Sequence, residues 1–328
     1  MDTSRHISLV FGFLNERAEY AVLRNYQGLP DDNSSRDIDI IISKRFFREI
    51  KRELVECLCQ EGWRIITYLN SDRLITFVCA KNVDNKTEIV QWDFFVNTSV
   101  WGVELMSAEE FLEHRVWNGF LWHVDVVGEF LDKYLYNRAV GASYPAKYEK
   151  IRLQITDYRL QITDNSQQIL TPAEQSSRPP KIGGQYDAHR RVAEKLNEVF
   201  GCGDLVVCDG MSGKRLLWNA VKWNLKHRPM GLLAGVCAFL YTFVRNYLRS
   251  NTGFAIGFTG PDGVGKTTVI DMLIARLGDV FRTAHSYMHF RPMLFGNLGE
   301  VVHSAGLKKE VDREYTKPHR GGRVGVVS

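Results

Sequence analysis

A glycine-rich stretch late in the chain has the residue types and the spacing that bind nucleotide phosphates. Residues 254–270, FAIGFTGPDGVGKTTVI, contain the full pattern G-x-x-x-x-G-K-[ST]. In this pattern glycines let the backbone curl, N–H groups converge on the phosphates, lysine meets the β- and γ-phosphates and threonine ligates Mg²⁺. The residues expected to bind ATP are Gly260, Asp262, Gly263, Val264, Gly265, Lys266, Thr267 and Thr268, with Thr267 holding Mg²⁺. The alternative is a glycine-rich turn that matches by chance.

The residues on either side of this loop predict the elements that must position it. Ala255 to Phe258 is apolar and predicts a buried strand. After the loop, apolar residues from Val269 to Leu277 recur at the spacing of one helix face. The order strand, loop, helix is the one that the phosphate-binding pattern requires.

Within the loop, Asp262 to Thr268 closely resembles thymidylate kinases, nucleoside monophosphate kinases whose loop has the form D-G-x-G-K-T-T. Thymidylate kinases place an arginine and a proline after their second strand, where the phosphate of the acceptor nucleotide binds. Here the strand candidate 284–290 leads into Arg291 and Pro292. The resemblance implies an ATP-dependent phosphotransferase in which Lys266 acts on the triphosphate and Arg291 contacts an acceptor phosphate. The alternative for Arg291 is an ordinary arginine at a strand end.

Three aspartates early in the chain form a second set of chemically competent residues. Asp37 and Asp39 alternate with isoleucines in a predicted strand, so they share one face, and Asp93 lies in a later strand candidate, 87–96. Carboxylates in this pattern hold two Mg²⁺ ions around a nucleoside triphosphate. The alternative is a solvated strand end after a turn for Asp37 and Asp39, and a partly exposed edge strand for Asp93.

The aspartate pattern resembles the nucleotidyltransferase fold, a small mixed sheet with flanking helices. That superfamily places a Gly-Ser or Gly-Gly pair shortly before the first aspartate, where it grips the phosphates. This chain has Leu23-Arg24-Asn25-Tyr26 there. The resemblance implies an α/β domain able to transfer a nucleotide with Mg²⁺ at Asp37, Asp39 and Asp93.

The chain divides into four predicted segments. Residues 1–149 form the nucleotidyltransferase-like domain, 150–185 a low-complexity linker with the direct repeat RLQITD, 186–252 a helical bridge, and 253–328 a partial P-loop domain. Within the first segment, residues 107–148 are expected to be helical, opening with a capping box at Ser107 and Glu110. This layout resembles bacterial two-domain proteins often assigned to polysaccharide clusters.

The last segment offers fewer elements than a complete kinase domain needs. A doubly wound P-loop fold has about five parallel strands joined by long crossovers. Two strand candidates occur between Ala255 and Ser328, and neither an aspartate-ended strand nor an arginine-rich lid follows them. We therefore expect an incomplete doubly wound domain, truncated at its C-terminus and impaired as a kinase.

Composition and charge indicate where the protein is expected to be located and which partners it is expected to bind. A net charge of +4, from 42 basic and 38 acidic residues, gives no strong signal for nucleic acid. Six cysteines without a C-x-x-C pair are expected to be reduced core thiols of a cytoplasmic protein, and the N-terminus lacks the features of a secretory signal. The apolar segment 230–248 is expected to be a packed or interfacial helix with peripheral membrane contact rather than a span.

Three functions follow as expectations. The first is an ATP-binding phosphotransferase of thymidylate kinase type, whose phosphate acceptor is open among a nucleotide, a sugar and a lipid-linked intermediate. The second is Mg²⁺-dependent nucleotidyl transfer by the N-terminal domain. The third is a non-catalytic assembly protein that binds nucleotide.

Overall fold

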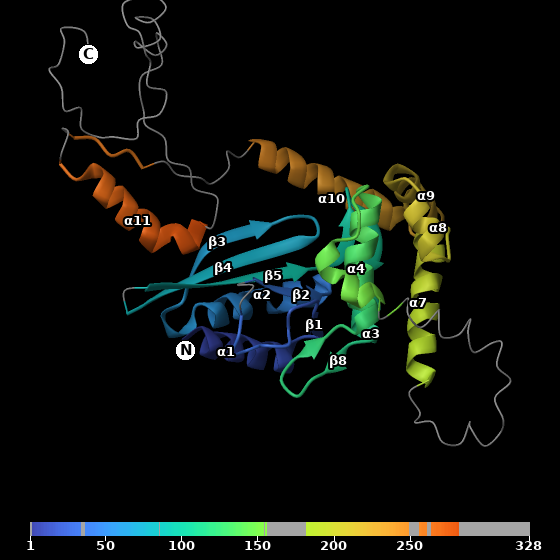
Figure 1. The fold of residues 1–328 in the computed structure, drawn as a ribbon, viewed down its shortest axis with the longest axis horizontal. Helices are drawn as coiled ribbons and strands as arrows, with labels where there is room; N and C mark the ends of the chain where they lie inside the picture. Colours follow the sequence, from blue (N-terminus) through green and yellow to red (C-terminus); the bar gives the residue numbers. More distant parts are fainter. Residues whose placement is uncertain are drawn as a thin grey trace, which may run out of the picture. The chain divides into compact units, whose positions relative to one another are not determined.

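The computed structural model describes residues 2–33, 37–84, 86–153, 155, 182–248, 256–260 and 264–281. The chain separates into two units, Met1–Val280 and Phe281–Ser328, and the elements below belong to the first, apart from the last residue of one helix. The fold is mixed α/β, as the sequence predicts, with a seven-stranded mixed sheet and helices (Figure 1).

The sheet has the strand order β3-β4-β5-β2-β1-β9-β8. Its strands are β1 (Tyr20–Val22), β2 (Asp37–Ile42), β3 (Arg64–Asn70), β4 (Leu74–Val83), β5 (Lys86–Phe95), β8 (Val116–Trp117) and β9 (Trp122–His123). The pairs β2–β5 and β1–β9 are parallel and the other neighbours are antiparallel. Strands β2 to β5 lie where the alternation of apolar and polar residues predicts them.

Two helices cover one face of this sheet. In Figure 1, α1 (Asp2–Arg17) and α2 (Lys44–Leu58) lie beneath the strands. They share a buried cluster with alternate strand residues, among them Ile38, Ile40 and Trp92. Because side chains in a strand alternate between faces, the residues between these, including Asp39 and Asp93, face the other side of the sheet.

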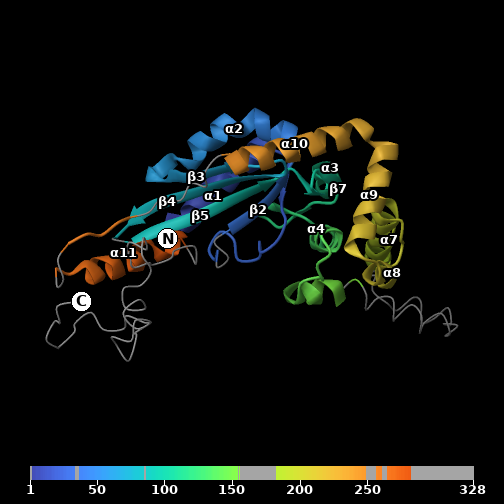
Figure 2. The ribbon, with the colours of Figure 1, turned by 90° about the horizontal axis from the view of Figure 1, so that it is seen from above.

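On the opposite face, the β1–β2 end of the sheet shares a buried cluster with a hairpin and helices from both halves of the chain. The hairpin is β6 (Asn97–Val100) with β7 (Val103–Ser107), followed by α3 (Ala108–Glu113), α4 (Val126–Ala139) and, further on, α7 (Ile182–Phe200), α8 (Leu205–Gly210) and α9 (Gly213–His227). Single turns of 3-10 helix occur at Gln60–Gly62 and Ala146–Tyr148. One buried cluster joins α3, α4, α7, α8 and α9, and Figure 2 shows α7, α8 and α9 side by side. The predicted helices of the bridge therefore pack on the N-terminal domain.

The helical expectation for residues 107–148 is only partly correct. The capping box is present, because Glu110 N donates to the Ser107 hydroxyl and Ser107 N donates to the Glu110 carboxylate. The short hairpin β8–β9 then interrupts the helices. Its turn is set by Asn118, whose side chain accepts from the backbone N–H groups of Phe120 and Leu121.

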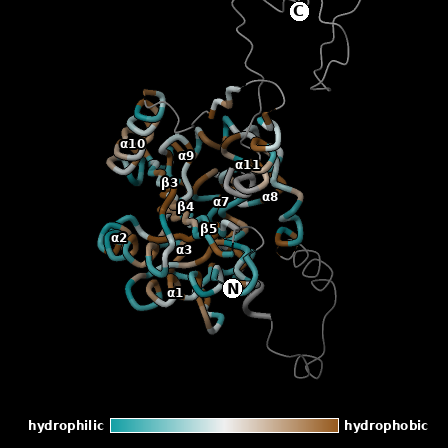
Figure 3. The backbone as a smooth tube through the Cα atoms, turned by 90° about the vertical axis from the view of Figure 1, so that its left-hand side faces the viewer, coloured by the Kyte–Doolittle hydropathy of each residue, from teal (hydrophilic) through white to brown (hydrophobic). Residues whose placement is uncertain are grey.

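Helix α10 (Pro229–Leu248) follows α9 after the predicted break at Arg228 and Pro229. A stripe of residues every third or fourth position, including Leu232, Gly235 and Thr242, is buried or half-buried. Gly235 lies so close to Gly102 in the β6–β7 turn that a Cβ on Gly235 would come 2.2 Å from the Gly102 carbonyl oxygen. Figure 3 colours much of the helix toward the hydrophobic end, in contrast to α2.

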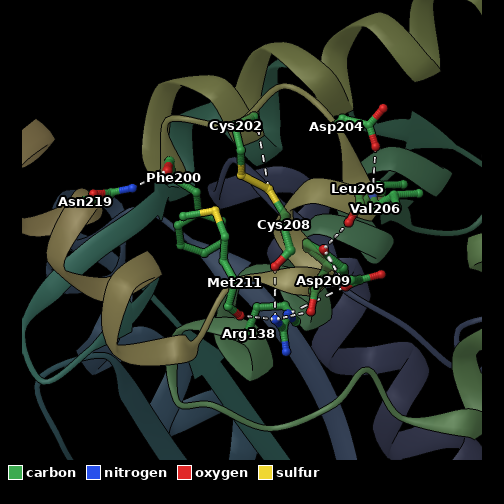
Figure 4. Close-up of a disulfide and its surroundings, with 11 residues drawn as sticks. Arg138, Phe200, Cys202, Asp204, Leu205, Val206, Cys208, Asp209, Met211 and Asn219 are labelled. Carbon is green, nitrogen blue, oxygen red and sulfur yellow. Dashed lines mark hydrogen bonds and ion pairs between the residues drawn. A yellow bond between two sulfur atoms is a disulfide. The ribbon is translucent and has the colours of Figure 1, made fainter.

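The cysteine prediction is wrong for four of the six residues. Cys202 and Cys208 form a disulfide (Figure 4), and Cys59 and Cys237 are exposed; Cys57 and Cys79 are buried free thiols, as expected. Gly201, with φ +67°, ends α7 and lets the chain turn back into α8, which brings two cysteines six positions apart together. Disulfides persist in oxidising compartments, so a cytoplasmic location stays a prediction.

Arg138 of α4 holds the segment that carries Cys208. Its guanidinium donates to the backbone carbonyls of Cys208 (3.0 Å), Asp209 (3.1 Å) and Met211 (2.7 Å), as Figure 4 shows. Tyr134 of the same helix donates to the Asp209 carboxylate at 2.8 Å. The disulfide thus belongs to a loop that is fixed to the N-terminal domain.

The strand expected at 255–258 is wrong over its described part. Residues 256–258 lie outside any strand, and Ile256 is exposed rather than buried, since no described strand pairs with it. The helix expected after the loop is confirmed as α11 (Lys266–Phe281). Most of the predicted linker, residues 156–181, lies outside the described residues, and its described ends are helical, because residues 150–153 form a helical turn and α7 begins at Ile182.

Candidate functional site

Asp37, Asp39 and Asp93 come together on one face of the sheet. Strands β2 and β5 pair in parallel with Asp39 opposite Asp93, and Asp37 lies two residues earlier on the same face. One carboxylate oxygen from each aspartate lies within 4.8 Å of the others. The sequence prediction that these three residues are neighbours is confirmed.

Asp39 is the most enclosed of the three, with 2% of its surface exposed. Its Oδ2 accepts from Arg24 Nη2 at 2.7 Å, and Arg24 Nη1 reaches Asp132 Oδ2 at 3.2 Å. Burial raises the pKa of Asp39 to about 6, and the positive charge of Arg24 opposes that rise. Arg24 therefore bridges two buried carboxylates with a single positive charge.

Asp93 is oriented by hydrogen bonds within the sheet. Its Oδ1 accepts from Thr76 Oγ1 at 2.5 Å across the β4–β5 ladder, and its Oδ2 accepts from Gln91 Nε2 at 2.8 Å. Asp93 is buried, whereas Asp37, at the start of β2, is half-buried and leads toward solvent. The cluster thus has a fixed inner side and an outer member that a solute can approach.

A second layer of charge lies behind Arg24 on α4. Asp132 accepts from Thr98 Oγ1 at 2.8 Å and pairs with Lys133 Nζ at 3.5 Å. Burial lowers the pKa of Lys133 and raises that of Glu129 on the same helix. Carboxylates therefore outnumber the cations Arg24 and Lys133 around the cluster.

The donor set fits a divalent cation. Carboxylate oxygens are the hard ligands that Mg²⁺ and Mn²⁺ take in proteins, and three carboxylates close together favour a cation that offsets their repulsion. Asp37, Asp39 and Asp93 would hold it. The Asp39 Oδ2 that pairs with Arg24 would be shared with the metal or released by the arginine.

Sequence reasoning missed the partners of the cluster. Arg24 lies where the expected resemblance to nucleotidyltransferases would place a glycine pair, and an arginine at that position is the signal that could have pointed to it. Its partner Asp132 is 108 positions away in the chain and lies on a helix that has no recognisable motif. Asn25, next to Arg24, has φ +57°, the left-handed conformation that glycine adopts without cost.

The glycine loop is described in part. Gly265 has φ +85°, which requires the conformational freedom of glycine, and α11 begins at the next residue, Lys266. Lys266 Nζ donates to the Gly260 carbonyl at 2.6 Å, so the lysine folds back across the loop. Thr267 and Thr268 are exposed in the first turn of the helix, and Val264 is exposed before it.

Three predicted site residues lie outside the described part of the chain: Asp262, Gly263 and Arg291. The described part of the loop therefore shows the lysine and threonine at a helix N-terminus, where N–H groups and the helix dipole favour anions. Of the predicted loop residues, Gly260 and Lys266 are in contact, through the hydrogen bond from Lys266 Nζ to the Gly260 carbonyl. Comparisons with protein-family models, curated proteins and solved structures found no match for this chain.

Proposed function

We propose that the N-terminal domain carries out metal-dependent nucleotidyl transfer at Asp37, Asp39 and Asp93. The observation that supports this most is the parallel register of β2 and β5, which sets Asp39 against Asp93 and gathers all three carboxylates within 4.8 Å. A bound divalent cation would polarise a triphosphate and stabilise the charge that develops as an acceptor hydroxyl displaces pyrophosphate.

In this proposal Arg24 replaces the missing glycine pair by a different chemistry. A glycine pair binds phosphate through backbone N–H groups, whereas a guanidinium donates two parallel hydrogen bonds to phosphate oxygens. Arg24 already binds a carboxylate oxygen of the cluster at 2.7 Å. If a cation took that carboxylate, Arg24, still paired with Asp132, would supply guanidinium N–H groups for a phosphate of the substrate.

The test uses the full chain and two readouts. Mn²⁺ binding is followed by electron paramagnetic resonance, and transfer of label is followed with each of the four α-³²P-labelled nucleoside triphosphates. Asp39→Asn is expected to lower both by more than about 100-fold, because it removes a metal ligand. Asp31→Asn, a surface aspartate whose Oδ1 accepts from Ser4, serves as the control and is expected to leave both unchanged.

Two results would contradict the proposal. Mn²⁺ binding that is equal in Asp39→Asn and wild type would show that the cluster is not the metal site. Absence of label transfer with all four nucleotides would remove the reaction, even if the metal binds.

We also propose, as a second function, ATP binding at the loop 260–268 in the manner of thymidylate kinases, with Arg291 contacting an acceptor phosphate. The supporting observation is that α11 begins at Lys266, directly after Gly265 in the left-handed conformation. Lys266→Ala should weaken binding of a fluorescent ATP analogue by more than about 100-fold, because it removes the charge that meets the β- and γ-phosphates. Lys214→Ala on α9 is the control.

Turnover separates the kinase from the remaining candidate, a nucleotide-binding assembly protein. ATP bound through Lys266 but not consumed in the presence of nucleoside monophosphates or sugars would favour the assembly protein. Equal ATP binding by Lys266→Ala and wild type would exclude both.

A further inference from the structure

Helix α10 exposes an apolar face, unlike a helix on the surface of a soluble domain. Such helices bury an apolar stripe and expose polar residues. In α10 the stripe that packs on the protein includes Gly235 and Thr242, and Arg245 donates to the backbone carbonyl of Asn70. The packed side of the helix therefore mixes the polar residues Thr242 and Arg245 with half-buried apolar residues such as Leu232, and it is not the only apolar side of the helix.

The outward face of α10 is apolar over its whole length. Its large exposed side chains are Met230, Leu233, Leu240, Tyr241, Phe243, Val244, Tyr247 and Leu248. Leu233, Leu240, Val244 and Tyr247 recur every third, fourth or seventh position, on the side opposite Gly235 and Thr242. Of the eight exposed side chains, four are more than 60% exposed, with Tyr247 at 82% and Leu248 at 76%. An apolar face of this size marks a surface that is covered by another phase or molecule.

Two ordinary explanations for a long apolar helix do not fit α10. A core helix is mostly buried, yet in α10 only Thr242 is buried. A signal sequence lies near the N-terminus, whereas α10 begins at Pro229. Among the described residues it is the one helix long and apolar enough to cross a membrane.

The charge around α10 identifies what covers it. From Gly210 to Pro261 the sequence contains no aspartate or glutamate and has seven lysines and arginines, and the outward face of the helix itself is uncharged. Lys222 and Lys226 are exposed on α9, next to the exposed Trp218 and Leu225. An exposed apolar helix in a segment with basic residues, tryptophan and tyrosine but no acidic residue has the composition of a helix at an anionic lipid surface.

Contacts along the helix decide how it meets lipid. The backbone of α10 touches the β6–β7 turn at Gly235, and α9 and β7 also contact the helix. A helix that crosses the bilayer would have to leave these contacts. We propose that α10 is a membrane-binding helix that lies in the headgroup region of an anionic bilayer, with its outward face in the acyl boundary and the basic residues of α9 against the lipid phosphates.

The test is flotation of the full chain with vesicles of phosphatidylcholine, alone or mixed with phosphatidylglycerol. Wild type is expected to float with the mixed vesicles only. Leu240→Asp with Val244→Asp should lower that binding about 100-fold, because it places charge on the inserted face. Lys222→Gln with Lys226→Gln should lower it about tenfold, because each lysine contributes attraction to anionic lipid.

Matched variants elsewhere act as controls. Val206→Asp with Val207→Asp changes two exposed valines of α8, and Arg45→Gln with Arg52→Gln removes two exposed charges of α2; neither pair should alter flotation. Failure to float with either vesicle would overturn the proposal. If wild type is then dimeric by light scattering and Leu240→Asp with Val244→Asp makes it monomeric, the face binds a second copy. Equal binding to neutral vesicles that resists alkaline carbonate would overturn it in favour of a spanning helix.

Discussion

The acid cluster (Asp37, Asp39 and Asp93) and the glycine loop (residues 260–268) differ in how specific their sequence patterns are and in how much structure surrounds them. The loop has a specific sequence pattern, but its described residues are mostly exposed and 256–258 form no strand. The aspartates form a much weaker pattern, yet two of the three are buried, paired in register and surrounded by partners. A short motif identifies residues that are adjacent in sequence. A site made from two strands and a helix depends instead on contacts between distant residues, which only the fold brings about.

The largest expected effect concerns the ion pairs of the acid cluster. Arg24→Met should lower the free energy of unfolding by about 3 to 5 kcal/mol, because it leaves Asp39 buried without its ion-pair partner and leaves Asp132 with Lys133 alone. Addition of Mg²⁺ should restore part of this loss, since the metal would take over the charge. Urea unfolding with and without Mg²⁺ measures both.

Arg45→Met on α2 is the matched control, because it breaks an exposed pair with Glu49 and should cost less than about 0.5 kcal/mol. If Arg24→Met lowers the free energy of unfolding as little as this control does, the ion pairs of the acid cluster do not stabilise the fold. The contrast between the cluster and the loop would then be wrong.

A second prediction concerns acid sensitivity of the sheet that carries the aspartates. His6 is buried against Trp63, with ring centroids 4.2 Å apart, and its Nε2 accepts from Trp92 Nε1 at 3.2 Å. Burial lowers the pKa of His6 to about 4, with Lys81 adding to the effect. The unfolded chain has a histidine pKa of about 6.5, so between these values it binds more protons than the folded chain and stability falls as pH falls.

His6→Gln keeps an acceptor for Trp92 but does not titrate. Between pH 7 and pH 4 the wild type should lose about 3 kcal/mol more stability than this variant in urea unfolding. Asp39, whose raised pKa acts in the opposite sense, is present in both proteins and cancels in the difference. Parallel pH profiles would show that His6 is hydrated or protonated in the fold.

The third prediction tests whether the disulfide between Cys202 and Cys208 affects the acid cluster. Replacement of Cys202 and Cys208 by serine should lower the free energy of unfolding by about 2 kcal/mol, the loop-closure value for so short a ring, and leave Mn²⁺ binding unchanged. Cys237→Ser, at an exposed free thiol, should change stability by less than about 0.5 kcal/mol. Loss of Mn²⁺ binding on removal of the disulfide would show that the two regions are coupled.

The smallest expected effect is at the loop. Lys266→Ala should change the free energy of unfolding by less than about 0.5 kcal/mol, because its bond to Gly260 is exposed to water. Comparison with Arg24→Met shows how much the fold is stabilised by an exposed lysine of the loop and by a buried arginine of the acid cluster. A loss of several kcal/mol in Lys266→Ala would mean that the loop is packed more firmly than its exposure indicates.

The sequence predicted those parts of the fold that depend on short-range patterns. Alternation identified β2 to β5 and put Asp37 and Asp39 on one face, and turn spacing identified α2, α7 and α9. Hairpin β8–β9 was missed because its strands have two residues each and are rich in the same aromatics as the helices around them. The apolar run at 256–258 shows the opposite error, since a strand needs a neighbour as well as a pattern.

The candidate site was predictable to the same limit. The three aspartates were visible because period two and a shared β-sheet relate them. Arg24, Asp132 and Thr98 were not, because only the packing of α4 and β6 against the sheet brings them together. Cys202 and Cys208 were missed for a related reason, as their pairing depends on the turn at Gly201.

The contact between Gly102 and Gly235 leaves this pair of positions with no route for compensatory change. Most close contacts tolerate a larger residue on one side if the residue on the other side becomes smaller. Glycine has no side chain, so neither Gly102 nor Gly235 can become smaller. Any side chain at either position must displace the backbone of α10 from the β6–β7 turn. The placement of α10 is therefore encoded by two residues 133 positions apart that cannot exchange volume, and substitutions at the two should fail to rescue each other.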